Sequence, residues 1–204
     1  LLESLGVHFV FAPTPEEMYS AEEMAIPFVF DFDGLDKVME GKMRPGHFNG
    51  VVQVVSRLFE LVRPTRAYFG EKDFQQLAII RYMVERSAMA PQFQGIQIIG
   101  CPIVREPSGL AMSSRNERLS AAEKQTAVAI SQALISSLEW AKSADVATVQ
   151  QRVIDTINAI EGLEVEYYDI VDKDTLQPTD KWQNAVGCVT VFCGSVRLID
   201  NIQY

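Results

Sequence analysis

The sequence predicts an α/β protein in two parts: an incomplete parallel-sheet domain, then a small α+β domain with a helix pair and an antiparallel sheet. Three observations predict this arrangement. Over about the first half, apolar runs of strand length alternate with segments of helical periodicity. The pattern changes at a polar, glycine-containing stretch, residues 106–118. The C-terminal part then carries short apolar runs joined by a tight-turn sequence.

The chain begins with a helix signal at residues 1–5 and a short apolar run at residues 7–11 that ends before Pro13. The run is typical of a buried strand, and we expect His8 within it to have a structural role. Because an α/β domain rarely begins with the tail of a helix, we expect that an N-terminal part of the domain precedes Leu1.

Apolar periodicity predicts the other elements of the first domain. Val51, Val55, Leu58 and Val62 recur at helical spacing, and Pro64 follows where such a helix should stop. The expected elements are an apolar run at residues 28–30, a helix at 46–62, a strand at 66–70, a helix at 73–85 and a strand at 95–100. Strands and helices that alternate in this way form a parallel sheet.

The second domain begins near Val104, so the predicted domains are residues 1–103 and 104–204. Ser120 and Glu123 have the spacing of a helix capping box. Two amphipathic helices are expected after it, with apolar positions from 127 to 138 and from 146 to 160.

Three strands are predicted to close the chain. Residues 163–168 carry their apolar side chains at odd numbers, which is the pattern of a half-exposed strand. Residues 186–193 and 196–199 are apolar runs, and Gly194–Ser195 between them suits a two-residue type II′ hairpin. The sequence therefore predicts a small antiparallel sheet.

Charge and hydropathy argue against several classes of function. The formal net charge is -9, and no block of Lys and Arg forms a basic patch, so we expect no nucleic-acid partner. No apolar run reaches the ~20 residues of a membrane helix, and no charged-then-apolar leader begins the chain. We therefore expect a cytoplasmic protein without a membrane partner.

The three cysteines, Cys101, Cys188 and Cys193, form no C-x-x-C pair. Cys188 and Cys193 are five positions apart in a strand-like run, so their side chains should point to opposite faces of the sheet. We expect all three thiols to be small buried hydrophobes in a reducing compartment. A metal or redox role is the alternative, and we assign no metal ligands.

The first segment that can carry chemistry is residues 69–76, Phe-Gly-Glu-Lys-Asp-Phe-Gln-Gln. It joins the C-terminal end of a predicted parallel strand to a helix, where open α/β sheets bind ligands and helix N-termini favour anions. Lys72 can meet a phosphate there as a mobile point charge. The structural alternative is that Asp73 and Gln76 form a helix cap, which requires no ligand.

The second segment, residues 109–116, places hydroxyls and the guanidinium of Arg115 in a glycine-led loop between the two domains. Such groups recognise oligophosphates, and Arg can bind them bidentately. A solvated linker with local turn hydrogen bonds is the alternative.

A third segment, residues 44–48, contains His47, which could titrate near neutrality but is better explained as a capping or packing histidine at a helix start.

Taken together, these segments resemble the pantothenate synthetase family of the class I aminoacyl-tRNA-synthetase-like nucleotidyltransferases, whose nucleotide domain is Rossmann-like. The likeness runs from about Gly6 to Ile202. The matching segments are residues 44–48, 70–73 with Gln75 and Gln76, 104–106, 109–116 and 197–202. There are two departures. Residues 87–94 are longer than usual and should enlarge a surface loop. The chain resembles only the C-terminal two-thirds of the family, and neither His8 nor His47 matches the His-x-Gly-His motif of the family's N-terminal part.

The resemblance implies an AMP-forming ligase, commonly a homodimer, that joins pantoate to β-alanine through a pantoyl-adenylate and uses ATP with Mg²⁺. Lys72 and Arg115 would be catalytic. Pantoate would contact Gln76 and, as a weaker assignment, Arg44. ATP would contact Gly70, Glu71, Lys72, Asp73, Val104, Met112, Ser113, Ser114 and Arg115. Without the His-x-Gly-His half of the site, we expect this chain to be inactive alone.

Two alternatives remain open at this point. One is a related nucleotidyltransferase with another acceptor, which ATP–pyrophosphate exchange with a different acid, independent of pantoate, would favour. The other is a truncated ATP-binding or oligomerisation module. ATP binding without turnover by this chain, together with full turnover by the complete protein, would indicate truncation and not a different function.

Overall fold

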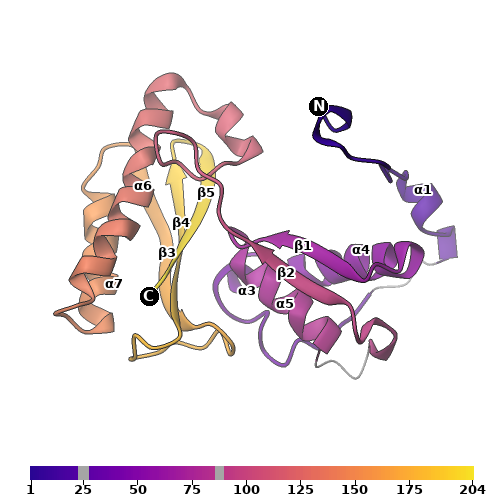
Figure 1. Cartoon of the computed structure of the whole chain (residues 1–204). Helices are drawn as coiled ribbons and strands as arrows, with labels where there is room; N and C mark the ends of the chain where they lie inside the picture. Colours follow the sequence, from indigo (N-terminus) through magenta and orange to yellow (C-terminus); the bar gives the residue numbers. More distant parts are fainter. Residues whose placement is uncertain (23–27, 86–89) are drawn as a thin grey trace.

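The computed structural model describes residues 1–22, 28–85 and 90–204, and it confirms the α/β class (Figure 1). The first part contains β1 (Arg66–Gly70), β2 (Gln97–Cys101), α3 (Met39–Met43), α4 (His47–Val62) and α5 (Phe74–Glu85). The second part contains α6 (Ala121–Trp140), α7 (Val146–Asn158), β3 (Leu163–Asp172), β4 (Ala185–Cys193) and β5 (Val196–Gln203). The short elements are η1 (Glu3–Leu5), α1 (Pro15–Met18), η2 (Pro91–Phe93) and η3 (Ser114–Arg118). Among the described helices, none has the length and apolar character that crossing a bilayer would require.

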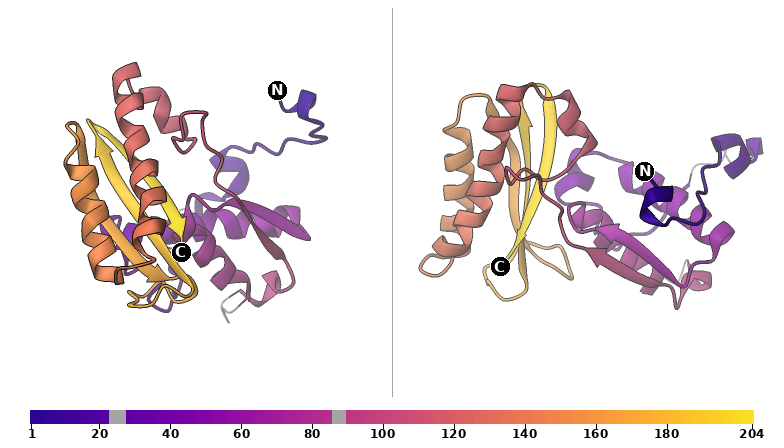
Figure 2. Two further views of the ribbon diagram at one scale, coloured as in Figure 1. Left: turned by 60° about the vertical axis from the view of Figure 1, so that its left-hand side comes forward. Right: turned by 45° about the horizontal axis from the view of Figure 1, so that its top comes forward.

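The N-terminal segment does not form the predicted strand. A single 3-10 turn, η1, replaces the expected helix, and residues 7–11 are extended but exposed, with Phe9 at 92 % exposure. Within the described ranges no strand pairs with them, and a strand requires an edge that satisfies its N–H and C=O groups. His8 is exposed with its neighbours, so its expected place in a buried strand is wrong. Figure 2 shows this segment extending away from the rest of the molecule.

The predicted alternation of helix and strand is confirmed from α4 to β2. α4 and α5 each begin one residue later than predicted, and β1 has the predicted bounds. β1 and β2 pair in parallel, from Arg66 opposite Gln97 to Gly70 opposite Cys101. The run at residues 28–30 is not a strand, although Phe30 is buried against Phe32 in the core. This arrangement places the turn after β1 at the C-terminal edge of the parallel pair.

The second part is an antiparallel meander in the order β3-β4-β5. Gly194 has φ +55° and its partner Ser195 does not have a positive φ, as a type II′ hairpin requires. A register shift between Val165 and Tyr167 leaves Glu166 as a bulge in β3. The bulge breaks the predicted alternation, so Tyr168, and not Tyr167, packs in the core with Leu163.

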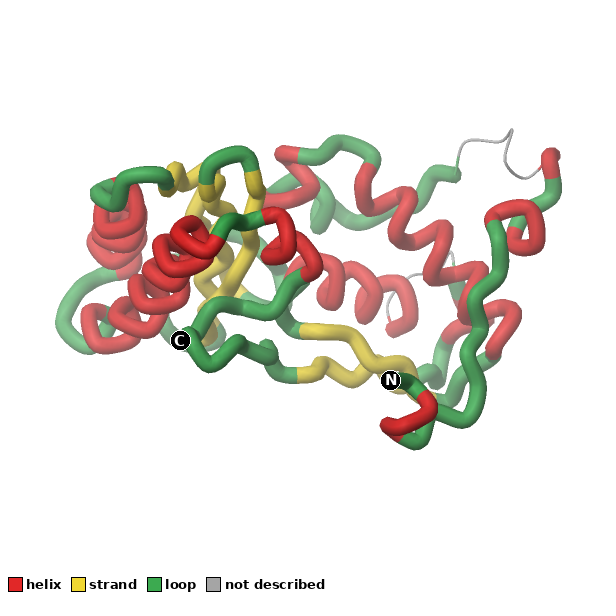
Figure 3. The backbone as a smooth tube through the Cα atoms, turned by 90° about the horizontal axis from the view of Figure 1, so that it is seen from above, coloured by secondary structure: helices red, strands yellow, loops and turns green. Residues whose placement is uncertain are grey.

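The two faces of the three-stranded sheet belong to two hydrophobic cores. One face packs against α6 and α7 and the other packs toward α4 and α5, as Figures 1 and 3 show. Cys193 lies in the first core and Cys188 in the second, which confirms that the two side chains point to opposite faces. Cys101 is only part-buried, because it ends β2, which pairs on one side alone within the described residues. The division at residues 103 and 104 stays a prediction.

The predicted long loop at residues 87–94 lies partly outside the described residues, which omit 86–89. In the described part, Pro91, Gln92 and Gln94 are exposed, while Ala90 and Phe93 are buried and η2 spans Pro91–Phe93. Ring contacts join Phe93 to Phe59 of α4, with ring centroids 5.8 Å apart.

Candidate functional site

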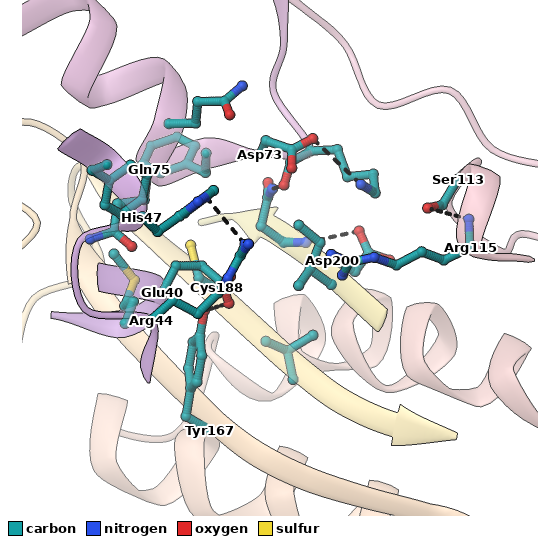
Figure 4. A pocket seen from close by; sticks show the side chains of 18 of the residues that line it. Glu40, Arg44, His47, Asp73, Gln75, Ser113, Arg115, Tyr167, Cys188 and Asp200 are labelled. Carbon is teal, nitrogen blue, oxygen red and sulfur yellow. Dashed lines mark hydrogen bonds and ion pairs between the residues drawn. The ribbon is translucent and has the colours of Figure 1, made fainter. Parts of the chain in front are cut away.

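A cavity of about 240 Å³ lies where the two parts meet, and residues from both parts line it (Figure 4). The first part contributes α3, the start of α4 and the turn between β1 and α5. The second contributes the start of η3 and residues of β3, β4 and β5. Segments that are far apart in the sequence therefore share one site.

The turn after β1 supplies Lys72 and Asp73 to the cavity, and the first turn of α5 supplies Gln76. β1 ends at Gly70, and the Glu71 N–H donates to the Cys101 carbonyl at 2.8 Å, which holds the turn against β2. The Lys72 side chain is 18 % exposed, and its Nζ lies 3.4 Å from a carboxylate oxygen of Asp73. The lysine therefore stands at the strand end where the sequence predicted an anion contact.

The loop of residues 109–116 forms a second wall and is tightly held. Ser113 caps η3 by accepting a hydrogen bond from the Arg115 N–H at 3.2 Å. The Asn116 amide, 4 % exposed, donates to the Glu106 carboxylate at 2.9 Å and the Ala111 carbonyl at 3.0 Å. The Ser113 bond is a local turn bond, as the linker interpretation expects, whereas the burial of Asn116 does not fit a solvated linker. Ser113, Ser114 and Arg115 line the cavity.

Glu40 of α3 is the centre of a charged network that the sequence did not predict. Arg197 of β5 donates to both Glu40 carboxylate oxygens, at 2.9 and 2.6 Å, and also to Glu166 at 2.9 Å. The Tyr167 and Thr190 hydroxyls donate to Glu40 at 2.9 and 3.1 Å. Burial raises the pKa of Glu40, but the hydrogen bonds and charge of Arg197 more than offset this and hold the pKa below its ordinary value of 4.5. Glu40 therefore connects α3 of the first part to β3, β4 and β5 of the second part.

Arg44 and His47 lie beside this network (Figure 4). An Arg44 Nη1 is 3.2 Å from Nε2 of His47 and 3.6 Å from Glu40. Burial, and then the charge of Arg44, lowers the pKa of His47, so the ring is neutral near pH 7 and Nε2 accepts from the guanidinium. Gly46, and not His47, is the N-cap residue of α4, so the capping interpretation of His47 is wrong. The His47 ring packs on Phe48, which fits the packing interpretation.

The cavity brings together seven of the residues assigned from the sequence: Arg44, Lys72, Asp73, Gln76, Ser113, Ser114 and Arg115. Four others, Gly70, Glu71, Val104 and Met112, do not line it; Val104 and Met112 are 64 % and 54 % exposed. Polar lining residues that the sequence reasoning missed include Glu40, Tyr167, Asp200 and Asn201. The last two lie in residues 197–202, a segment that carries the family resemblance, although the sequence reasoning assigned them no role.

The site has the chemistry of an anion-binding site. Lys72, Arg115 and Arg44 line one cavity in a chain whose formal net charge is -9. Glu40, Asp73 and Asp200 line it too, but Glu40 is paired with Arg197 and Asp200 with Arg105. The hydroxyls of Ser113 and Ser114 add neutral donors. A fork-shaped guanidinium, a mobile ammonium and hydroxyls together suit a ligand with several phosphates.

Comparisons with known proteins agree with this description. Residues 1–203 match the family model of Pantoate-beta-alanine ligase. A pantothenate synthetase of Phocaeicola vulgatus is 58 % identical over the whole chain, which spans 71 % of that protein. One from Porphyromonas gingivalis is 48 % identical over the same shares. The crystal structure of a Thermus thermophilus pantothenate synthetase matches 99 % of the chain, with 71 % of its own length covered, 39 % identity and a TM-score of 0.89. A Francisella tularensis pantoate-beta-alanine ligase, complexed with beta-gamma ATP and beta-alanine, matches with a TM-score of 0.70 and 28 % identity, covering 99 % of the chain and 67 % of its own.

Proposed function

This chain belongs to the pantoate-beta-alanine ligase family, and we propose that it serves the ATP-dependent condensation of pantoate with β-alanine. Pantoate and ATP form pantoyl-adenylate and pyrophosphate, and the β-alanine amine then displaces AMP. The single observation that carries this proposal is the meeting of Lys72 with Ser113, Ser114 and Arg115 in one cavity. The Francisella tularensis relative, complexed with beta-gamma ATP and beta-alanine, supports it. We also propose a cytoplasmic homodimer.

The first step requires cations because it brings a carboxylate toward a polyanion. Lys72 and Arg115 would stabilise the charge that develops on the α-phosphate and on the leaving pyrophosphate. Ser113 and Ser114 would hydrogen-bond the phosphate oxygens, and Asp73 would lie beside the nucleotide. Both cations are near the cavity but keep protein partners: Asp73 for Lys72, and the Arg197 carbonyl, at 3.0 Å, for Arg115. When ATP binds, phosphate oxygens would replace the Asp73 carboxylate and the Arg197 carbonyl as partners of the two cations.

The remaining assigned residues fill supporting positions in this proposal. Gly70 ends β1 and Glu71 begins the turn that carries Lys72, so their backbone would set the path of the chain beside ATP. The Met112 N–H donates to the Val104 carbonyl at 2.9 Å, which places these two exposed residues side by side at the entrance to the loop. Gln76 would hydrogen-bond pantoate from the first turn of α5. Arg44, already close to Glu40 and His47, remains the weaker candidate for an anion contact.

Mg²⁺ would accompany ATP. Across residues 1–22, 28–85 and 90–204, no group of three or more His, Cys, Asp or Glu side chains is placed to hold a metal ion. Asp73, with a side chain 48 % exposed, offers one carboxylate at the cavity, and phosphate and water oxygens would supply the other ligands. When bound, the ion would neutralise part of the phosphate charge.

The second part of the chain would act as a lid, because a mixed anhydride must be kept from water. Its loop of residues 109–116 and its strand β5 already form one side of the cavity. Closing of this part over the substrates would keep water from the mixed anhydride. The division into residues 1–103 and 104–204 describes the two bodies that would move.

The decisive experiment follows both steps in two proteins. The protein expressed from the complete natural gene should exchange ATP and pyrophosphate only with pantoate, and form AMP only when β-alanine is also added. The 204-residue chain should bind ATP without turnover, because neither of its histidines, His8 and His47, matches the His-x-Gly-His motif. Exchange driven by another acid would overturn the proposal. Turnover by the 204 residues at the rate of the complete protein would overturn the expectation of inactivity.

A further inference from the structure

The last strand, β5, contacts each segment that carries a proposed phosphate-binding residue. The Arg197 main-chain carbonyl accepts from Arg115 at 3.0 Å. The Asp200 carboxylate accepts from Arg105 in a two-point pair at 2.6 and 3.0 Å. The Asn201 side chain reaches the turn that carries Lys72. β5 therefore contacts several segments of the site that lie far apart in the sequence.

Asn201 makes the contact with the Lys72 turn. Its side-chain Nδ2 donates to the carbonyl oxygens of Glu71 at 2.8 Å and of Lys72 at 3.0 Å. Asn201 is 3 % exposed, so water does not easily replace these bonds. On its other side the turn is held by the Glu71 N–H on the Cys101 carbonyl at 2.8 Å. The turn is thus fixed between β2 and β5.

The neighbouring residue, Asp200, helps to hold Asn201 in position. Its Oδ1 accepts the Asn201 main-chain N–H at 2.8 Å while both carboxylate oxygens bind Arg105. Arg105 also donates to the Gly109 carbonyl at 3.2 Å, where the loop toward Arg115 begins. Successive residues of a strand point to opposite faces, so Asp200 and Asn201 reach two different segments from one place.

We propose that Asn201 is a positioning residue that sets where the Lys72 ammonium stands in the cavity. This inference rests on the proposed function, in which Lys72 meets the ATP phosphates. Lysine is a point charge on a flexible stem, so the position of its main chain decides which atoms it can reach. A displacement of about 1 Å from the productive geometry costs roughly 10²-fold in rate.

The test is a double-mutant cycle in the protein expressed from its complete gene, with Asn201→Leu and Lys72→Ala. Asn201→Leu keeps the shape of the side chain and removes both donors. Alone, it should slow single-turnover adenylation from ATP and pantoate about 10- to 100-fold, and leave amide formation from preformed pantoyl-adenylate within about 2-fold. In the Lys72→Ala background the same change should slow adenylation by less than about 2-fold, because the group it positions is gone.

Asn158→Leu is the matched control. Asn158 also bonds the main chain, accepting from the Val165 N–H at 2.8 Å, but at the end of α7 and away from the cavity. It should leave both rates unchanged. If Asn201→Leu does not fold, Asn201→Ala takes its place in the cycle.

The outcomes separate this inference from the proposed function. If the wild-type protein forms no pantoyl-adenylate, the proposed function fails. If it does, and Lys72→Ala slows adenylation, the inference is overturned by an Asn201 variant with an unchanged rate, by equal slowing of both steps, or by slowing that persists in the Lys72→Ala background.

Discussion

At the scale of single residues, Lys72 carries the most direct prediction. Lys72→Ala in the protein from the complete gene should lower the adenylation rate about 10²–10³-fold, or roughly 3–4 kcal/mol, because the transition state has more charge at phosphate than the bound substrates. β-Alanine affinity should not change, since amide formation follows the loss of pyrophosphate. Single-turnover rates measured from ATP plus pantoate and from preformed pantoyl-adenylate separate the two steps.

Lys142→Ala controls for the loss of a lysine. Lys142 is 68 % exposed and paired with Glu139, outside the cavity. Equal slowing of Lys72→Ala from both starting points would mean that Lys72 is not specific to adenylation. Unchanged rates from both starting points would mean that Lys72 has only a structural role, as the partner of Asp73.

Glu40 predicts a pH dependence of stability. Its pKa in the folded protein lies below the ordinary 4.5, so its contribution is fully present above that value and is lost as the pH falls through the folded pKa. Glu40→Gln should therefore be less stable than wild type near pH 7, and the difference should shrink below pH 4.5. Urea unfolding at a series of pH values measures this. Glu139→Gln is an exposed control on α6 and should not show this loss of the difference from wild type at low pH. The prediction would be contradicted if the free energy of unfolding of Glu40→Gln stayed equally far below that of wild type down to low pH.

At the scale of elements, the start of α6 tests how strongly local sequence defines a helix. The Glu123 N–H donates to Ser120 Oγ at 3.2 Å, and the Ser120 N–H donates to the Glu123 carboxylate at 2.8 Å. Ser120→Ala should lower the free energy of unfolding by about 1 kcal/mol, because a first-turn N–H loses its partner. Ser136→Ala, at an exposed position inside the same helix, should cause no loss, since alanine favours helix interiors. Equal losses for the two variants in urea unfolding would show that the cap contributes nothing.

The bulge in β3 shows where reasoning about elements from the sequence failed. Strict alternation predicted Tyr167 on the face of Leu163 and Val165. The extra residue instead puts Glu166 and Tyr167 in succession toward Arg197 and Glu40. A bulge depends on the register with β4, and no pattern within β3 itself signals it.

At the scale of the whole molecule, Arg197 joins the two parts. Its side chain is 17 % exposed, and those of Glu40 and Glu166 are 14 % and 18 % exposed. Arg197→Met should lower the free energy of unfolding by roughly 3 kcal/mol, because it leaves the partly buried Glu166 without its cation and Glu40 with only the more distant Arg44, 3.6 Å away. Urea unfolding followed by tryptophan fluorescence and by circular dichroism measures the loss.

A rescue variant makes this prediction specific. Adding Glu40→Gln and Glu166→Gln to Arg197→Met removes the unpaired charges and should recover part of the lost stability. A loss below about 1 kcal/mol in Arg197→Met, or no recovery in the triple variant, would show that the network is not what joins the two parts.

Local sequence was enough to specify the α/β order of α4 to β2, the cap of α6, the hairpin at Gly194 and the lysine- and arginine-bearing segments of the site. These features depend on residues only a few positions apart, where periodicity, capping and turn chemistry act. Tertiary packing was needed to establish that residues 7–11 are exposed, that Cys101 is only part-buried, and that Glu40 meets Arg197 across 157 positions. It also brought Asn201 to the Lys72 turn. Such meetings depend on strand register and on which surfaces find a neighbour, and no local pattern in the chain specifies either.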